Sequence, residues 1–273
     1  MPDLRLRSGQ RLHYDLFDLP DPWVEHDTIV FHHGLGKTGA YWRPWVRRLV
    51  RDFRVITIDM LGNGASSRPR SFRWGIEAYA GHVAEVLDAV DVARAHFVGE
   101  GLGGCVGLQL AATEATRVAT LTLCATPYRP AEGGANLAAT SARIRREGLG
   151  PFVERTLPDR MDWSAHPPGM YEWFRRERLA TSPRVMAEQM AAQDGVDLEW
   201  ALPRIAAPTL LIVPGASPSS ADRQMQVMAE RISNATVASF PTERQWVTFS
   251  RPEECVAAFR AFLAAQGAAA QAR

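Results

Sequence analysis

The sequence predicts an α/β fold, namely a doubly wound, mostly parallel β-sheet with a helical insertion. Short apolar runs that are typical of buried strands alternate with helical patterns, as βαβ units require. The alternation stops after Pro127 and resumes near Thr209, and the stretch between contains helical patterns without an obvious strand. With 273 residues, the chain is long enough for one large domain that carries an insertion.

The first part of the chain begins with a predicted hairpin, in which strands at 4–7 and 11–16 are joined by the turn Ser8-Gly9. Buried strands follow at 28–32, 54–59, 95–98 and 118–124, and helices at 41–51, 76–90 and 102–113. Asp59 and Ser66 are expected to fix the turn after the second buried strand.

The alternation resumes in the last part of the chain, with predicted strands at 209–213 and 236–240 and helices at 221–232 and 252–264. These elements divide the chain into a core formed by 1–127 and 204–273 and a helical cap formed by 128–203. In open α/β sheets, ligands bind beyond the carboxyl ends of the strands, so the loops at those ends are the candidates for a site.

Charge and cysteine content narrow the class of protein. The 31 basic and 30 acidic residues nearly cancel, so we expect neither nucleic acid nor an anionic membrane surface as a partner. Three scattered cysteines show no disulfide or metal-site spacing, and no cofactor is expected. The first ten residues lack the apolar region of a signal peptide, and no run approaches the ~20 apolar residues of a membrane helix. We therefore expect a cytoplasmic protein.

Three glycine-containing motifs follow predicted strands, and together they are specific. They read HGLG at 33–36, DMLGNGAS at 59–66 and VGEGLGG at 98–104, and the last has the strand-turn-helix context of a nucleophile elbow. With these motifs the chain resembles the α/β-hydrolase superfamily, and within it the cap-bearing enol-lactone hydrolases, C–C bond hydrolases and esterases. The resemblance covers nearly the whole chain and implies the α/β-hydrolase fold with a cap.

The same resemblance implies that the catalytic triad is substituted. It places Gly101 at the nucleophile position, Gln245 at the position of the triad histidine, and Ser217 at the position of the triad acid. Glycine has no atom that can attack a carbonyl, and the amide of glutamine does not titrate near neutral pH. We therefore expect that the serine mechanism of the family cannot operate here.

The resemblance also implies an oxyanion site, formed by the backbone N–H groups of Leu35 and Leu102. Glu100 lies beside the vacant position, where it would act as a general base on water or else bond to neighbouring backbone or to an arginine. His33 matches a structural histidine that orders the oxyanion loop. An alternative is that His33 or His32 reaches the substrate and moves a proton.

Aromatic and methionine side chains are candidates for an apolar pocket or for simple packing. Trp246 is the preferred residue at the rim of the site on the sheet side. The candidates in the cap are Trp163, Met170, Trp173, Phe174, Met186 and Met190.

Two functions remain open. One is a cofactor-independent enzyme that acts on a small carbonyl or ester-like compound by water- or substrate-assisted chemistry, without a serine nucleophile. The other is a catalytically inactive hydrolase relative that binds a small ligand or a protein partner.

Overall fold

The computed structural model describes residues 3–130, 136–216 and 221–271 of the chain. Its strands form one sheet in the order β1-β2-β4-β3-β5-β6-β7-β8. The first two ladders, β1 with β2 and β2 with β4, are antiparallel, and all others are parallel. The strands are β1 (Asp3–Arg5), β2 (Arg11–Phe17), β3 (Thr28–His32), β4 (Arg54–Asp59), β5 (Ala95–Glu100), β6 (Val118–Cys124), β7 (Thr209–Pro214) and β8 (Ala235–Phe240). The predicted fold class is confirmed.

Helices cover both faces of this sheet, because alternate residues of each parallel strand point to opposite sides. Val30 of β3 belongs to one hydrophobic cluster, and its neighbours Ile29 and Phe31 belong to another. The first cluster includes residues of α2 (Ile76–Ala89), α3 (Leu102–Thr113) and α8 (Ala221–Arg231), and the second includes residues of α1 (Arg43–Leu49) and α10 (Pro252–Gln271). The sheet is therefore doubly wound, as expected.

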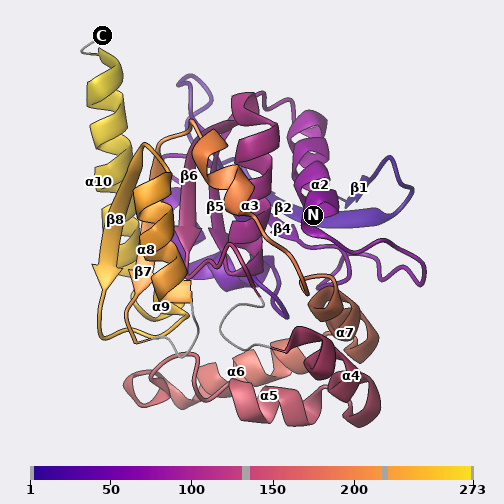
Figure 1. Ribbon diagram of the computed structural model, residues 1–273. Coiled ribbons are helices and arrows are strands. Elements are labelled where there is room, and N and C mark those ends of the chain that lie inside the picture. Colours follow the sequence, from indigo (N-terminus) through magenta and orange to yellow (C-terminus); the bar gives the residue numbers. More distant parts are fainter. Residues whose placement is uncertain (1–2, 131–135, 217–220, 272–273) are drawn as a thin grey trace.

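A helical segment is inserted between β6 and β7. It contains α4 (Leu137–Glu147), α5 (Gly150–Thr156), α6 (Pro168–Leu179) and α7 (Pro183–Ala191), which we call the inserted helices. Figure 1 shows them beneath the arrowheads of the strands, on the side where parallel strands end. This placement puts helical side chains opposite the loops in which a site is expected.

The remaining helical turns are short: η1 (Gly39–Trp42), η2 (Ala115–Arg117), η3 (Trp163–Ala165), η4 (Glu199–Arg204) and α9 (Val247–Ser250). The last helix, α10, extends beyond the predicted range of 252–264, because its alanine-rich end has high helix propensity. Within the described ranges, no helix has the length and apolar content needed to cross a membrane.

The turn after β4 is held by Asp59 and Ser66, as the sequence predicts. The two carboxylate oxygens of Asp59 accept hydrogen bonds from the backbone N–H groups of Gly39, at 2.7 Å, and Ala65, at 2.8 Å. The Ser66 hydroxyl donates to the backbone oxygen of Asp59 at 2.6 Å and accepts from the N–H of His13 at 2.8 Å. Side chains thus replace the regular ladder where the strand ends.

Candidate active site

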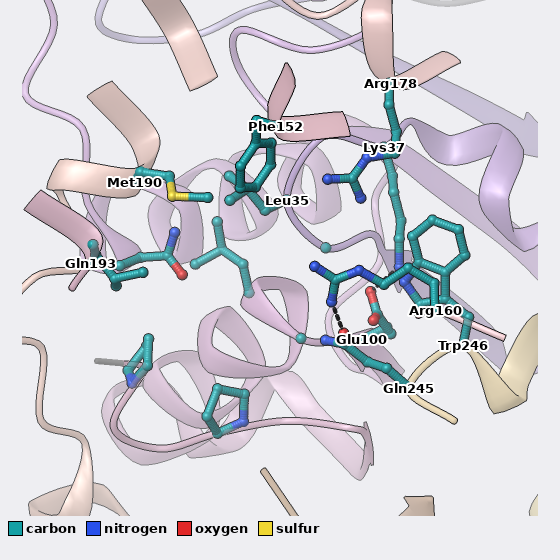
Figure 2. A pocket seen from close by; sticks show the side chains of 16 residues that line it. Leu35, Lys37, Glu100, Phe152, Arg160, Arg178, Met190, Gln193, Gln245 and Trp246 are labelled. Atoms are coloured by element: carbon teal, nitrogen blue, oxygen red, sulfur yellow. Dashed lines mark hydrogen bonds and ion pairs between the residues drawn. The ribbon is translucent and has the colours of Figure 1, made fainter. Parts of the chain in front are cut away.

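A cavity of about 240 Å³ lies between the carboxyl ends of the parallel strands and the inserted helices. Its walls come from the loops after β3, β5, β6 and β8 and from all four inserted helices or their ends. Figure 2 shows charged side chains gathered on one side of the cavity, with Leu35 and Met190 on the other and Phe152 between them. The volume is smaller than that of pockets for drug-sized ligands and therefore suits a small molecule.

The turn between β5 and α3 keeps the backbone of an elbow although its central residue is glycine. Gly101 has φ +54° and ψ −118°, and its N–H donates to the backbone oxygen of Cys124 at 3.0 Å. A side chain in this conformation is strained, whereas glycine adopts it freely. A Cβ atom built on Gly101 would have no neighbour within 4 Å. The place of a side chain at this turn is therefore open space at the cavity wall.

Two residues of the cavity wall have backbone N–H groups without a described acceptor. Leu35, in the loop after β3, and Leu102, the first residue of α3, both line the cavity. Among the described residues, no acceptor contacts the N–H of either one. The N-terminus of a helix favours negative charge, so the Leu102 amide is a suitable donor to a carbonyl oxygen or an anion.

Glu100 forms a buried ion pair with Lys37, which the sequence analysis did not single out. The Nζ atom of Lys37 lies 2.5 Å from Oε2 of Glu100, and their side chains are 4% and 2% exposed. Lys37 also lies over the rings of Tyr41 and Trp246, with Nζ 3.8 and 4.5 Å from their centroids. Burial lowers the pKa of Lys37 and outweighs the opposing effect of Glu100. The sequence analysis expected Glu100 either to act as a general base or to bond to backbone or to an arginine; the partner in the structure is a lysine.

Gln245 accepts a hydrogen bond from Nη1 of Arg160 at the edge of the cavity (Figure 2). The Nε atom of Arg160 donates to the backbone oxygen of Thr156 at 3.1 Å, and its backbone oxygen accepts from the N–H of Trp246 at 3.1 Å. Burial lowers the pKa of Arg160. The glutamine thus serves as a neutral acceptor for a guanidinium group.

Arg178 of α6 is 3% exposed and reaches the same side of the cavity. Its guanidinium carbon lies 5.7 Å from the ring centroids of both Phe152 and Trp246. In the part of the chain that the structure describes, its Nε atom is buried without a hydrogen-bond partner, and no carboxylate forms an ion pair with it. Burial lowers its pKa to about 9, and the nearby Arg160 contributes in the same direction. The group remains positively charged at neutral pH.

The two adjacent histidines do not line the cavity. Nε2 of His33 accepts the N–H of Met60 at 2.9 Å, while its Nδ1 lies 2.8 Å from the backbone oxygen of Gly34. Nδ1 of His32 lies 3.1 Å from the backbone oxygen of His33. Burial lowers the pKa of His32 to about 3 and that of His33 to about 4. His33 therefore fits the structural role that the resemblance implies. The alternative that His33 or His32 moves a proton at the site is corrected, because both rings are enclosed and contact neighbouring backbone.

Trp246 forms a wall of the cavity rather than its rim, because it is only 1% exposed. Of the six apolar candidates in the insertion, Met190 is the one that lines the described cavity. Phe174 packs against Trp246 instead, with ring centroids 4.6 Å apart. Ser217 lies outside the described residues, so its predicted place near the site stays a prediction.

The lining of the cavity limits its chemistry. Among its 16 described residues there is no serine, threonine, cysteine or histidine, and Glu100 is the one carboxylate. Cys105 is fully buried nearby, where its thiol donates to the backbone oxygen of Pro127 at 3.0 Å and burial raises its pKa to about 12. The described groups can hold a carbonyl oxygen, a water molecule and an anion, but they offer no hydroxyl or thiol nucleophile.

Sequence reasoning missed the three cations at the cavity: Lys37, Arg160 and Arg178. Lys37 directly follows the HGLG motif, which was a usable signal for a position near the site. The two arginines lie in arginine-rich stretches of the insertion, where nothing distinguishes them from exposed ones.

Comparisons with known proteins agree with the fold. A family model described as the alpha/beta hydrolase fold matches residues 27–252. The chain is 30% identical over 234 residues to the "Putative carbamate hydrolase RutD" of Stutzerimonas stutzeri, covering 83% of this chain and 87% of that protein. Two solved structures, an enol-lactonase from Burkholderia xenovorans LB400 and a hydrolase from Pseudomonas aeruginosa PA01, superpose with TM-scores of 0.88 and 0.87. They are 26% and 28% identical, and the matches cover 96% of this chain and 100% and 97% of theirs.

Proposed function

The chain belongs to the α/β-hydrolase fold family, and from this premise we propose that it hydrolyses a small carbonyl or ester-like compound with an activated water molecule instead of a serine. One observation carries the proposal. Open space at Gly101 lies in the same cavity as two free backbone donors, from Leu35 and Leu102, and the carboxylate of Glu100.

The backbone amides act on the carbonyl oxygen of the substrate. The N–H groups of Leu35 and Leu102 donate to this oxygen and stabilise the negative charge that develops as the carbonyl carbon is attacked. The attacking water occupies the space at Gly101. Its oxygen forms the new bond to the carbonyl carbon, and its proton passes to the carboxylate of Glu100.

The partner of Glu100 completes the proton transfers. The ammonium of Lys37 gives a proton to the leaving oxygen or nitrogen when the bond from the carbonyl carbon to that atom breaks. Glu100 is then a neutral acid and Lys37 a neutral amine. One proton transfer across their 2.5 Å contact restores the ion pair. The lowered pKa of Lys37 favours this role, because it makes the ammonium a better acid.

The names of the relatives support the substrate class. A carbamate and an enol lactone both contain a carbonyl carbon bonded to oxygen, and the two proteins so named are similar to this chain over most of its length. We therefore favour a small ester, lactone or carbamate.

The alternative function is binding without turnover, by a catalytically inactive relative that holds a small ligand or a protein partner. One observation favours it: Oε2 of Glu100 is already bound to the ammonium of Lys37, so this oxygen is not free to bind a water molecule.

The test is hydrolysis of 4-nitrophenyl acetate by the wild-type protein and by Glu100→Gln. We expect turnover above the uncatalysed rate, reduced roughly 100-fold or more in Glu100→Gln, since general base catalysis contributes about that much. Glu172→Gln changes an exposed glutamate of α6 in the same way and is the matched control, expected to keep the wild-type rate. Urea denaturation of each variant checks that it is folded.

An unchanged rate in Glu100→Gln would remove Glu100 from the mechanism. Absence of turnover in the wild-type protein would favour the binding function for this class of ester.

A further inference from the structure

The guanidinium group of Arg178 lies in the cavity wall and forms no ion pair with a described carboxylate. Glu100 is the acidic group that attracts it electrostatically, but Oε2 of Glu100 is bound to Lys37. Arg178 is only 3% exposed, and its guanidinium group lies beside the aromatic rings of Phe152 and Trp246. An ionised group removed from water is unfavourable unless it is paired and hydrogen-bonded. Contacts with aromatic faces recover only part of the lost hydration, because they supply no hydrogen-bond acceptor. The site therefore contains a buried donor that can accommodate a negatively charged ligand.

The surrounding charges strengthen this requirement. Lys37 is neutralised by Glu100, but the hydrogen-bond partner of Arg160 is the neutral amide of Gln245. Within residues 3–130, 136–216 and 221–271, neither Arg160 nor Arg178 has an ion pair with a carboxylate. The two guanidinium groups also repel each other, and each points into the cavity (Figure 2).

The opposite side of the cavity has a different character. Leu35 and Met190 present apolar surface there (Figure 2). A ligand that fits both sides has an anionic group at one end and a short apolar segment next to its carbonyl.

We propose that Arg178 is the anchor for a carboxylate of the ligand, so that the compound bound in this cavity is a small organic acid with a separate carbonyl group. The planar fork of the guanidinium matches the two oxygens of a carboxylate. The assignment of the carbonyl to the amides of Leu35 and Leu102 rests on the proposed function. The assignment of the carboxylate to Arg178 rests on the burial and charge of that residue.

The experiment is calorimetric titration with two ketones that cannot be hydrolysed, 5-oxohexanoate and 6-hydroxyhexan-2-one. Both have a methyl ketone at one end, and they differ at the other end, which is a carboxylate in the first and a neutral alcohol in the second. We expect the wild-type protein to bind 5-oxohexanoate at least about tenfold more tightly, as a charge-assisted hydrogen bond would give.

Variants then assign the preference to one residue. Arg178→Met keeps an apolar chain in the same place, and we expect it to lose about tenfold or more in affinity for 5-oxohexanoate but little for the alcohol. Arg178→Lys keeps the charge without the fork and is expected to lie between the two. Arg176→Met removes an exposed arginine from the same helix and is expected to match the wild-type protein.

Equal affinity for the two ketones would overturn the proposal, as would no binding of 5-oxohexanoate in the millimolar range. Equal weakening of both ketones by Arg178→Met would assign the residue to packing and would overturn it too. Because neither ketone is a hydrolase substrate, a preference for the acid would stand even if ester turnover is absent. Conversely, turnover of esters without this preference would keep the proposed function and remove the anchor.

Discussion

Buried ionisable groups occur in two neighbouring regions of this protein, and the regions differ in where the partners of those groups come from. In the loops after β3 and β4, His33 and Asp59 bond to backbone groups of the protein itself. In the cavity, Arg178 has rings beside it but no described acceptor, and Arg160 bonds to a neutral amide. The first region is complete without a ligand, whereas the second is not.

The difference teaches how to separate structural from ligand-binding polar groups. A buried charge that the fold itself satisfies holds backbone in place, and its loss affects stability. A buried charge that the fold leaves unsatisfied lowers stability, and its natural explanation is a ligand. This distinction holds only for charged groups. The side-chain amide of Asn63, in the turn after β4, also lacks a described hydrogen-bond partner, but a neutral group costs less free energy to bury than a charged one.

The largest expected change in the free energy of unfolding comes from a substitution at the turn after β4. Asp59→Ala removes two hydrogen bonds that a carboxylate accepts from backbone N–H groups, and it leaves the buried Gly39 donor without a partner. We therefore expect a loss of about 4 kcal/mol in the free energy of unfolding, measured with urea. The matched control is Asp88→Ala, which removes only half-exposed ion pairs and is expected to cost much less. Equal losses in the two variants would contradict the structural role of Asp59.

The second effect is a dependence of stability on pH that comes from His33. Its pKa is about 4 in the folded protein, below the value of 6.5 for a free side chain, so between these values the unfolded chain binds a proton that the folded chain does not. The stability is thus fully present above pH 6.5 and is lost as the pH falls toward 4, by up to about 3 kcal/mol. The main reason is burial, which disfavours the charged form of the imidazole. In addition, Nε2 accepts the Met60 N–H and cannot do so when protonated.

Urea denaturation at several pH values, on the wild-type protein and on His33→Gln, checks this prediction. His32 and His82 also have lowered pKa values and contribute in the same direction, so the difference between the two proteins is the quantity to compare. A difference that stays constant from pH 7 to about 4 would show that His33 is not the titrating group.

The smallest expected change in the free energy of unfolding comes from a substitution in the cavity, and it is an increase instead of a loss. Arg178→Met replaces an uncompensated buried charge with an apolar chain, so we expect the free energy of unfolding to rise by about 1 to 2 kcal/mol in the absence of ligand. Arg176→Met serves again as the control and should change little, because its side chain is exposed. A marked loss of stability in Arg178→Met would mean that the protein itself satisfies this charge, and the contrast between the two regions would disappear.

Most of the core fold could be predicted because its signals are local. The predicted ranges 28–32, 54–59 and 118–124 coincide with β3, β4 and β6, since a parallel strand covered on both faces is a continuous apolar run. The bounds of the inserted helices could not be predicted one by one. Three of the four begin without a side chain that caps the first turn, so this signal for a helix start is missing.

Part of the candidate site was also predictable, for the same reason. Leu35, Glu100, Gly101 and Leu102 all line the cavity, because the motifs that contain them are turns at strand ends, and those turns meet at one edge of the sheet. Gln245 and Trp246, read from their place before the last helix, line it as well. His33 holds backbone of these loops, as its resemblance to a structural histidine implied, whereas the alternative that His33 or His32 reaches the substrate was wrong. Adjacency to a motif does not reveal which way a buried ring is held.

The sequence by itself determined which reactive atoms are absent: glycine at 101 supplies no nucleophile, whatever the fold around it. Only the tertiary structure decided the charge of the cavity, by bringing Lys37 to Glu100 and by burying Arg160 and Arg178 beside them. Coulomb interactions and the cost of dehydration depend on distance and burial, and residues 37, 100, 160 and 178 are far apart in the chain. An arginine in the sequence is therefore only a charge, and its burial without a partner is what makes it a candidate binding group.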